Sequence, residues 1–203
     1  MISEDQLSSI NGLVGHRFHD PWERLAPPYF RCNGYDAAML REELEITDRR
    51  DIAALLRRAR VCRLGLAVHE EAYVVPLSYG YDAEAHVLYF HTAQKGKKID
   101  CIKANPRVCF EVEGSVRIKE GAAHACSWGV LYESVIGYGA IVELLSLEDK
   151  TRALQCLTEH QAGRSLDWKM SENAVAGTRV WRLDIESATG KRSFPLEEDL
   201  SAS

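Results

Sequence analysis

Three apolar, β-rich segments follow one another at short intervals, and they constrain the fold more than any other part of the sequence. Residues 61–68, 73–81 and 86–91 are rich in Val, Leu, Tyr and Phe, which favour strands. The turns between them contain Glu70-Glu71 and then Asp82-Ala83-Glu84. Connections this short suit antiparallel strands better than parallel ones. The sequence therefore predicts an antiparallel sheet built from hairpins.

Further elements are predicted on both sides of these hairpins. A helix begins at the caps Thr47 and Asp48 and ends near residue 60, with apolar residues at helical spacing. A short helix opens at Gly96 and ends at Asn105, because Pro106 disfavours helical geometry in the residue before it. Strands are predicted at 107–112, 134–145 and 179–185, a third helix at 147–161 and a turn at 187–190. Six strands with two to three flanking helices indicate a mainly β fold with α, a small antiparallel barrel.

Several details of this reading can be checked against a structure. Residues 113–128 are expected to be irregular, and Gly137 and Gly139 to mark bends or bulges. Ser146 is expected to cap the third helix. That helix is expected to bury Leu147, Ala153, Leu154 and Leu157, whereas His69, His86 and His124 are expected at the surface.

The chain divides into three parts. Glycines and prolines punctuate residues 1–40 without a periodic pattern, so an irregular N-terminal tail or arm is expected there. Residues 41–193 form the domain, and residues 194–203 an acidic C-terminal tail. In the N-terminal tail His16, His19 and Cys32 match no zinc-ligand spacing, so no metal site is expected. The six cysteines include no CxxC pair and are expected to be reduced.

Composition excludes two classes of function. The formal net charge of −5, from 25 Lys and Arg against 30 Asp and Glu, argues against a basic nucleic-acid-binding protein. The best candidate for a membrane span, residues 128–147, is broken by Glu133 and Glu143. Glu4 and Asp5 stand where a secretory signal would place basic residues. A cytoplasmic protein without a membrane or nucleic-acid partner is therefore expected.

The segment from His91 to Asp100 is the most informative one for function. It leaves a strand, passes Gly96 and enters a helix with Lys97 and Lys98 in its first turn. The helix dipole disfavours cations there, and the unpaired N–H groups of a helix start bind anions. A phosphate ligand would compensate both lysines. From spacing alone, a phosphate site and a solvated surface pair are about equally supported.

The order of several segments resembles a known superfamily. These segments are RVCRLGLA at 60–67, YVVPLSYGYD at 73–82, LYFHT at 88–92, NPRV at 105–108, SVIGYG at 134–139 and TGK at 189–191. Together they resemble the FMN-binding split-barrel superfamily typified by pyridoxamine 5′-phosphate oxidase, and most of all its nitroimidazole-resistance branch. The resemblance implies a split β-barrel, a homodimer with FMN at the subunit interface, and electron transfer from NAD(P)H to a small-molecule acceptor.

The resemblance also implies roles for individual residues. The strand along the flavin ring corresponds to Pro76, Leu77, Ser78 and Tyr79, which would contact the ring largely through backbone groups. The phosphate would be bound by Lys97 and Lys98, with Thr92 as a hydroxyl ligand. Ser134 corresponds to a polar residue near the ring from the facing strand, and the strand from residue 135 to 145 would contribute to the dimer interface.

His91 corresponds to a histidine beside the flavin in the nitroimidazole-resistance branch. Its imidazole would donate a proton to an acceptor that takes up hydride, although a structural histidine on a strand face is nearly as well supported. The chain ends KRSFPL and acidic residues instead of the Trp- and Arg-containing tail of the true oxidases, so oxidation of pyridoxamine phosphate is not expected. Two alternatives remain: a haem-binding or haem-handling split barrel with His91 or His124 as axial ligand, and a non-catalytic flavin-binding module.

Overall fold

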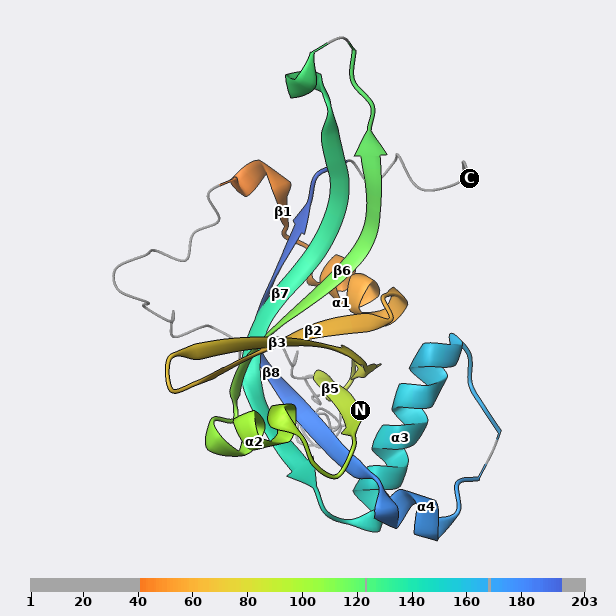
Figure 1. Cartoon of the computed structure of the whole chain (residues 1–203). Helices are drawn as coiled ribbons and strands as arrows, with labels where there is room; N and C mark the ends of the chain where they lie inside the picture. The colour runs from red at the N-terminus through yellow and green to blue at the C-terminus, as the bar shows by residue number, and fades with distance from the viewer. Residues whose placement is uncertain (1–40, 123, 168, 195–203) are drawn as a thin grey trace, which may run out of the picture.

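One antiparallel sheet forms the centre of the molecule. The computed structural model describes residues 41–122, 124–167 and 169–194, and Figure 1 shows how their elements are arranged. The expectations for residues 1–40, with His16, His19 and Cys32, and for the tail beyond residue 194 lie outside the described residues. The sheet has the order β3-β2-β6-β7-β8-β5-β4, and the short strand β1 pairs with β8.

The bounds of the elements follow the predicted ones closely at the start of the domain. The strands are β1 (Glu45–Ile46), β2 (Val61–Val68), β3 (Glu71–Ser78), β4 (Gly80–Asp82), β5 (Val87–Thr92), β6 (Arg107–Lys119), β7 (Gly129–Leu144) and β8 (Arg179–Arg192). The helices are α1 (Arg49–Arg58), α2 (Lys97–Ala104), α3 (Leu147–Ala162) and α4 (Glu172–Gly177), with 3₁₀ turns η3 (Glu42–Leu44) and η4 (Ala125–Ser127).

The sheet is split between β3 and β5. The predicted strand at 73–81 is two strands, because the chain passes from β3 to β4 through Tyr79. β3 pairs with β2, whereas β4 pairs with β5, so β3 and β4 end the sheet on opposite sides. The buried phenol of Tyr79 donates a hydrogen bond of 2.7 Å to the carbonyl oxygen of Leu56 in α1. This contact fixes the point at which the strand changes partners.

Alternating side chains of the long strands build the core. Leu64 of β2, Phe110 of β6 and Leu183 of β8 are fully buried on the inner face. Leu55 and Leu56 of α1 pack into the same cluster, because their helical spacing places them on one side of the helix. A second cluster lies on the outer face of β5, where α3 covers the strand: Val87, Tyr89, Ala153, Leu154, Val175 and Val180.

Three predictions about strands are corrected by the structure. The sheet has eight strands rather than six, since β1 and β4 are added. The turn predicted at 187–190 is part of β8, which pairs with β7 along its whole length. The irregular stretch predicted at 113–128 is largely strand, because β6 continues to Lys119 across a register shift between Glu113 and Val116. A further shift at Tyr138/Gly139 confirms the bulge expected in β7.

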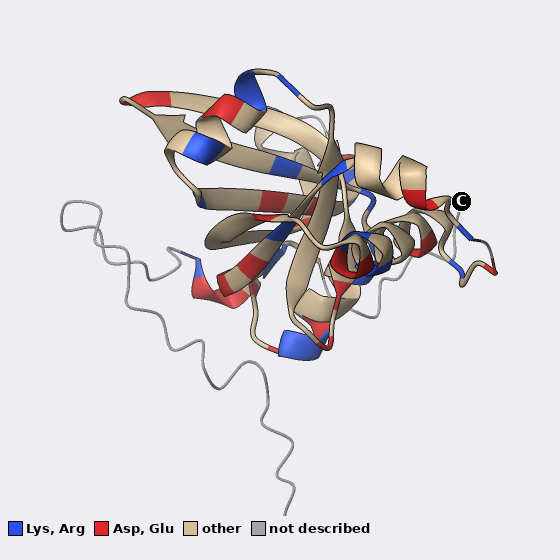
Figure 2. Ribbon diagram, turned by 90° about the horizontal axis from the view of Figure 1, so that it is seen from below, with Lys and Arg blue, Asp and Glu red and all other residues tan. Residues whose placement is uncertain are grey.

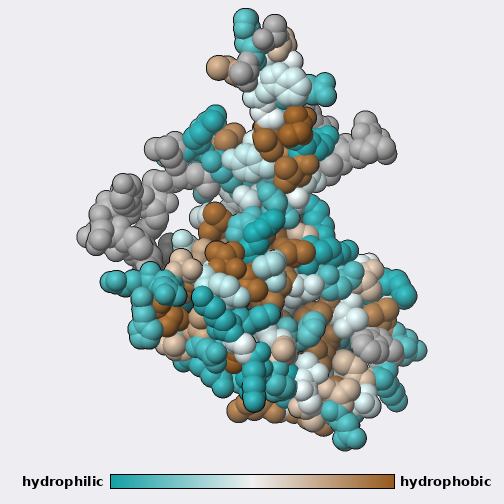
Figure 3. Space-filling model, viewed as in Figure 1, coloured by the Kyte–Doolittle hydropathy of each residue, from teal (hydrophilic) through white to brown (hydrophobic). Residues whose placement is uncertain are grey.

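The extended β6 and β7 form an arm that projects from the rest of the sheet, at the top of Figure 1. Val116 and Ile118 of β6 and Val130 of β7 are exposed on this arm. Figure 3 shows apolar side chains on the arm and over the middle of the same side of the molecule. The arm could not be predicted, because polar residues in 113–128 mask the strand pattern.

The helix caps were predicted correctly, but two side chains were not. Asp48 accepts a hydrogen bond from the amide of Arg50, and Ser146 accepts one from the amide of Asp149. Leu147, expected in the core, is 40% exposed in the first turn of α3. His86, expected at the surface, is buried and lies 3.3 Å from the phenol oxygen of Tyr81.

Charge and cysteine usage agree with an ordinary globular domain. Figure 2 shows basic and acidic residues interspersed over the sheet and helices. Five cysteines are free thiols: Cys62, Cys101, Cys109, Cys126 and Cys156. Within the described parts of the chain, no helix is long and apolar enough to cross a membrane. The same residues contain no cluster of His, Cys, Asp and Glu that could hold a metal ion.

Candidate functional site

The start of α2 is built for a polar ligand. Gly96 precedes the helix with φ 136°, a conformation that only glycine adopts without strain. No side chain caps this end, and the amides of Ile99 and Asp100 bond back to the carbonyl oxygen of Gly96. Lys97 and Lys98 follow directly, so two ammonium groups lie at the positive end of the helix dipole. The predicted helix from Gly96 to Asn105 is thereby confirmed.

Lys97 lies beside the start of β3. Its ammonium is 5.0 Å from the centre of the Tyr73 ring and 4.0 Å from a carboxylate oxygen of Glu71. Both partners of this ion pair are well exposed, so it contributes little to stability. Lys98 is half-buried. Lys97, one of the two predicted phosphate ligands, is therefore next to β3, the strand predicted to run along a flavin ring.

The four residues predicted to contact the ring do not all face the same way. Pro76 and Ser78 are exposed on the outer face of β3. Leu77 points inward against the core, and Tyr79 is fully buried. The backbone carbonyl of Tyr79 also accepts a hydrogen bond of 2.8 Å from the side chain of Gln161. The outer surface of β3 is thus formed by Pro76 and Ser78.

His91 and Thr92 lie at the other side of the split in the sheet. β4 pairs with β5 through Gly80 and Tyr89, and the sheet separates immediately beyond this pair. Ser78 and His91 are the next outward positions on the two sides of the opening, and both side chains are exposed. His91 therefore presents an exposed imidazole on β5, just beyond the residues that pair with β4.

The hydroxyl of Thr92 already forms hydrogen bonds within the barrel. Its side chain is buried, its hydroxyl donates to the carbonyl oxygen of Ala93 at 3.0 Å, and it accepts from the indole of Trp181 at 3.0 Å. A hydroxyl has one donor and two acceptor positions. Binding an anion through this hydroxyl would require its bond to Ala93 to be given up.

Two residues that the sequence reading missed hold the loop between β5 and α2. The side chain of Arg179 donates to the backbone carbonyl oxygen of Gln94 at 3.0 Å, and the side-chain Nε2 of Gln94 donates to the backbone carbonyl oxygen of Gly177 at 2.5 Å. These contacts join positions more than eighty residues apart in the chain. Local spacing carries no signal for such a contact, so only the fold reveals it.

Ser134 lies on the same outer face but away from the other residues. It occupies β7, three strands from β3 in the sheet order. At the usual strand spacing this separates it from Ser78 by about 14 Å. Ser134 therefore lies apart from Pro76 and Ser78 on the same outer face within one chain.

A charged cluster lies on β2 and β6, between Ser78 on β3 and Ser134 on β7. Arg63 of β2 donates to Glu111 at 2.9 Å and to Glu113 at 3.1 Å, both on β6. The hydrogen bond and charge of Glu111 raise the pKa of Arg63. Arg63 stands opposite Pro76 in the strand register, so this cluster is the polar neighbour of the predicted ring strand.

Comparison with known proteins gives an independent result. The model of the family described as Pyridoxamine 5′-phosphate oxidase matches residues 48–192, most of the described chain. The match covers α1, the complete split sheet from β2 to β8, and the start of α2. No curated protein matches the chain significantly.

Solved structures show the same fold. A proposed 5-nitroimidazole antibiotic resistance protein from Bacteroides thetaiotaomicron has a TM-score of 0.63 and 26% identity, over 73% of this chain and 86% of that one. A FAD-binding protein from Mesorhizobium loti has a TM-score of 0.52 and 28% identity, over 72% and 96%. A FAD- and haem-binding protein from Mycobacterium smegmatis, with a TM-score of 0.64 and 15% identity over 77% and 76%, shares the fold.

Proposed function

Because the chain belongs to the pyridoxamine 5′-phosphate oxidase family, we propose that it is a reductase that binds FMN and passes electrons from NAD(P)H to a small electrophile. The fold is that of the flavin-binding split barrels. The similarity to the Bacteroides thetaiotaomicron protein supports a nitro-group-bearing heterocycle as the class of acceptor to test first.

The observation that carries this proposal is the position of the α2 start. Lys97 and Lys98 combine with the uncapped amides of the helix to form a site for a phosphate. Nothing within 4 Å would meet a side-chain atom at Gly96, so the surface in front of the helix is open. These residues fit the phosphate of FMN. Lys97 contacts the Tyr73 ring of β3, and this strand, with Pro76 and Ser78 on its outer surface, offers a place for the flavin ring.

Bound FMN would supply the redox chemistry, taking hydride equivalents from NAD(P)H and giving them to the acceptor. The chain's own residues would orient both molecules. In this proposal the imidazole N–H of His91, which is exposed on β5, donates a proton to the acceptor. Its exposure leaves it accessible to a substrate that enters from solution.

The separation of Ser134 from Ser78 supports a homodimer. A polar residue about 14 Å across the sheet contacts the same ring only if a second chain supplies it. The outer face carries exposed apolar residues that a partner would cover: Val61, Val74 and Ile136. Val74 and Ile136 lie on the two strands that flank the Arg63 cluster. We propose that each FMN site is completed by Ser134 of the second chain.

Anaerobic reduction tests the proposed activity. The FMN-saturated protein should lose its flavin absorbance on addition of NADPH or NADH, and a nitroimidazole should restore it. His91→Gln should bind FMN as the original protein does, but return electrons to the nitroimidazole at least tenfold more slowly. His69→Gln, on the exposed β2–β3 turn, is the matched control.

Other outcomes separate the alternatives. Flavin that stays oxidised with both nicotinamide nucleotides would contradict the reductase and leave a flavin-binding module. A Soret band after addition of haemin, lost in the His91 variant, would instead support the haem-binding reading.

A further inference from the structure

A pocket lies apart from the residues assigned to the candidate flavin site. It has a volume of about 620 Å³ and lies between the C-terminal end of α1, strand β4 and helix α3. Sites for small molecules commonly have volumes of about 300–1,000 Å³. The lining residues are Arg57, Arg58, Arg60, Tyr81, Asp82, Ala83, Cys156, Glu159, His160 and Gly163. None of the residues assigned to the flavin site takes part.

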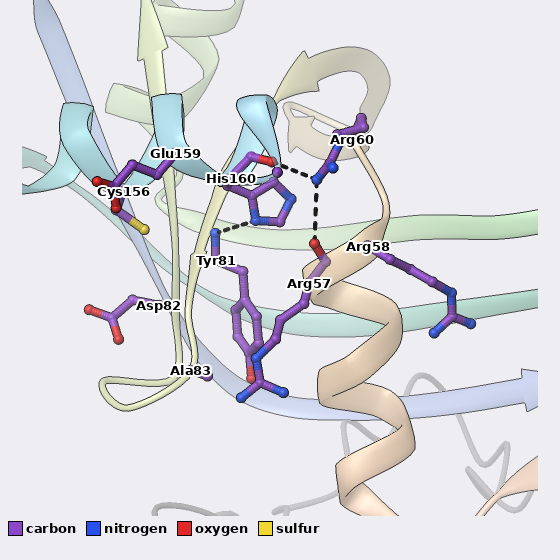
Figure 4. Close-up of a pocket in the computed structure, with 10 residues that line it drawn as sticks. Arg57, Arg58, Arg60, Tyr81, Asp82, Ala83, Cys156, Glu159 and His160 are labelled. Atoms are coloured by element: carbon purple, nitrogen blue, oxygen red, sulfur yellow. Dashed lines mark hydrogen bonds between the residues drawn. The ribbon is translucent and has the colours of Figure 1, made fainter. Parts of the chain in front are cut away.

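Two of the three arginines have no carboxylate partner. Arg58 forms an ion pair with buried Glu133, and Figure 4 shows its side chain turned away from the other two. The guanidinium of Arg57 lies over the Tyr81 ring at 5.9 Å. Arg60 donates only to backbone carbonyls, those of Arg57 at 3.5 Å and His160 at 2.5 Å. In the part of the chain that the structure describes, neither Arg57 nor Arg60 pairs with an acid.

A cation at the end of a helix is favourable by itself, because it faces the negative end of the helix dipole. That effect explains one arginine in the last turn of α1. Arg60 lies just beyond α1, where its guanidinium donates to carbonyls in the last turns of α1 and α3, and Gly163 makes room for it. A Cβ at residue 163 would lie 2.9 Å from the guanidinium of Arg60. Among the described residues, the pocket therefore carries two guanidinium groups without a carboxylate partner, which a bound anion could neutralise.

The two acidic residues of the pocket already accept hydrogen bonds from backbone amides. Asp82 accepts hydrogen bonds from the amides of Glu84 and Ala85, both at 3.0 Å. Glu159 accepts one from the amide of Leu166 at 3.1 Å. Figure 4 shows Asp82 and Glu159 on the wall opposite Arg57 and Arg60. One wall of the pocket is thus cationic, and the other offers carboxylate oxygens that can accept hydrogen bonds.

The remaining lining groups are neutral and fixed. His160 accepts a hydrogen bond from the amide of Tyr81 at its Nδ1 atom, so its Nε2–H donates to the carbonyl oxygen of Ala59. Burial lowers the pKa of His160, in keeping with this neutral form. Burial raises the pKa of Cys156 to about 11, so the thiol adds no negative charge. The backbone of Tyr81 and the ring of His160 are thus joined by a hydrogen bond within the lining of the pocket.

We propose that this pocket is a second ligand site, which binds a small phosphate monoester carrying hydroxyl or amino groups. Arg57 is the principal ligand of the phosphate, because its guanidinium has no competing acid. Arg60 contributes its remaining N–H groups. The hydroxyl or amino groups of the ligand donate to Asp82 and Glu159 on the facing wall. The proposal does not depend on the flavin chemistry.

Calorimetric titration of FMN-saturated protein with AMP tests this site. AMP should bind once per chain, and adenosine, which has the same ring and sugar without the phosphate, should bind at least tenfold more weakly. Arg57→Gln should weaken AMP binding by about tenfold to a hundredfold, the effect of losing a charged hydrogen bond. Arg50→Gln is the matched control, since Arg50 is exposed at the other end of α1.

Each other result would overturn the proposal. It fails if AMP does not bind at millimolar concentration, if adenosine binds equally well, or if Arg57→Gln binds AMP unchanged. It also fails if AMP releases FMN, because AMP would then occupy the flavin site. The thermal midpoint of Arg57→Gln should match that of the original protein, because the side chain is exposed. If the protein binds no FMN, the same titration without flavin still tests this pocket.

Discussion

Gly96 determines how the chain enters α2 and therefore where the two lysines lie. Its φ of 136° belongs to a region that residues with a side chain adopt only under strain. No neighbouring atom would clash with an added methyl group, so the cost of a substitution is conformational. The chain thus uses a single glycine to direct the helix start at the surface of β3.

Replacement of Gly96 should change both the stability of the protein and its affinity for FMN. Gly96→Ala should lower the free energy of unfolding by about 1–3 kcal/mol and weaken FMN binding, because the helix start must shift. Gly177→Ala is the matched control: it also has open space around it, lies at the end of α4 and has no positive φ. Denaturant unfolding of both variants checks this. Equal stability of the Gly96 and Gly177 variants would contradict the assignment of strain to Gly96.

At the scale of single residues, sequence patterns predicted the start of α2, while the binding roles of its residues stay predictions. Gly96, Lys97 and Lys98 were identified from the helix dipole and the family resemblance, and the structure places them at an uncapped helix start. The hydrogen bond from Trp181 to the hydroxyl of Thr92 could not be predicted, because the two residues are 89 positions apart in the chain. The anchoring of Gln94 by Arg179 was missed for the same reason.

At the scale of the elements, a buried ion cluster joins α1 to the sheet. The carboxylate of Glu133 in β7 is 1% exposed and contacts both Arg58 of α1 and Arg192 of β8, the latter at 3.1 Å. Arg192 also pairs with Asp51 at 3.3 Å. In the sequence, Glu133 only interrupts an apolar segment. Its partners come from distant strands and helices, so no local pattern predicts the cluster.

Loss of the Glu133 carboxylate should destabilise the folded protein. Glu133→Gln should lower the free energy of unfolding at neutral pH by about 3–5 kcal/mol, because two arginines lose their buried partner. Glu113→Gln removes a comparable pair with Arg63 at the surface and should cost less than about 1 kcal/mol. Urea unfolding of the two variants measures the difference. Equal effects would contradict the structural role of the cluster.

The Glu133 carboxylate should also make the stability of the protein depend on pH. Burial raises the pKa of Glu133, but the hydrogen bonds and charges of Arg58 and Arg192 outweigh it and hold the pKa below its ordinary value of 4.5. The stabilisation is therefore complete above pH 4.5 and is lost as the pH falls through the lowered pKa. The stability gap between the original protein and Glu133→Gln should shrink below pH 4.5. A gap that stays constant would contradict this assignment.

The elements were predicted with uneven success, for physical reasons. β2, α2 and the caps of α1 and α3 follow from local alternation, Gly96, Pro106 and capping residues. The division of one predicted strand into β3 and β4 depends on the contact of Tyr79 with Leu56. The extension of β8 through 187–190 depends on pairing with β7. Such long-range contacts override local turn signals.

For the molecule as a whole, the outer face of the sheet is the proposed dimer interface. Ile136 lies in the middle of this face, between Glu111 and Thr189 in the register, and is 44% exposed. An exposed apolar side chain in this position fits the core of an interface. The polar site residues Ser78 and Ser134 lie on the same face.

A charge on this face should separate the chains. Ile136→Glu should give a monomer in light-scattering measurements after gel filtration and should weaken FMN binding, because the second chain no longer supplies Ser134. Leu147→Glu, similarly exposed at the start of α3, should leave the assembly unchanged. A dimeric Ile136→Glu variant, or a monomeric one with full FMN affinity, would contradict the shared site.

The central claim is that the start of α2 binds the phosphate of a flavin, and comparing FMN with riboflavin tests it most directly. In fluorescence titrations, the protein should bind FMN at least tenfold more tightly than riboflavin, which lacks the phosphate. Lys98→Ala should weaken FMN binding by about tenfold to a hundredfold and leave riboflavin binding unchanged, whereas Lys103→Ala in the last turn of α2 should change neither. Equal affinities for FMN and riboflavin, or full FMN affinity in Lys98→Ala, would contradict the claim.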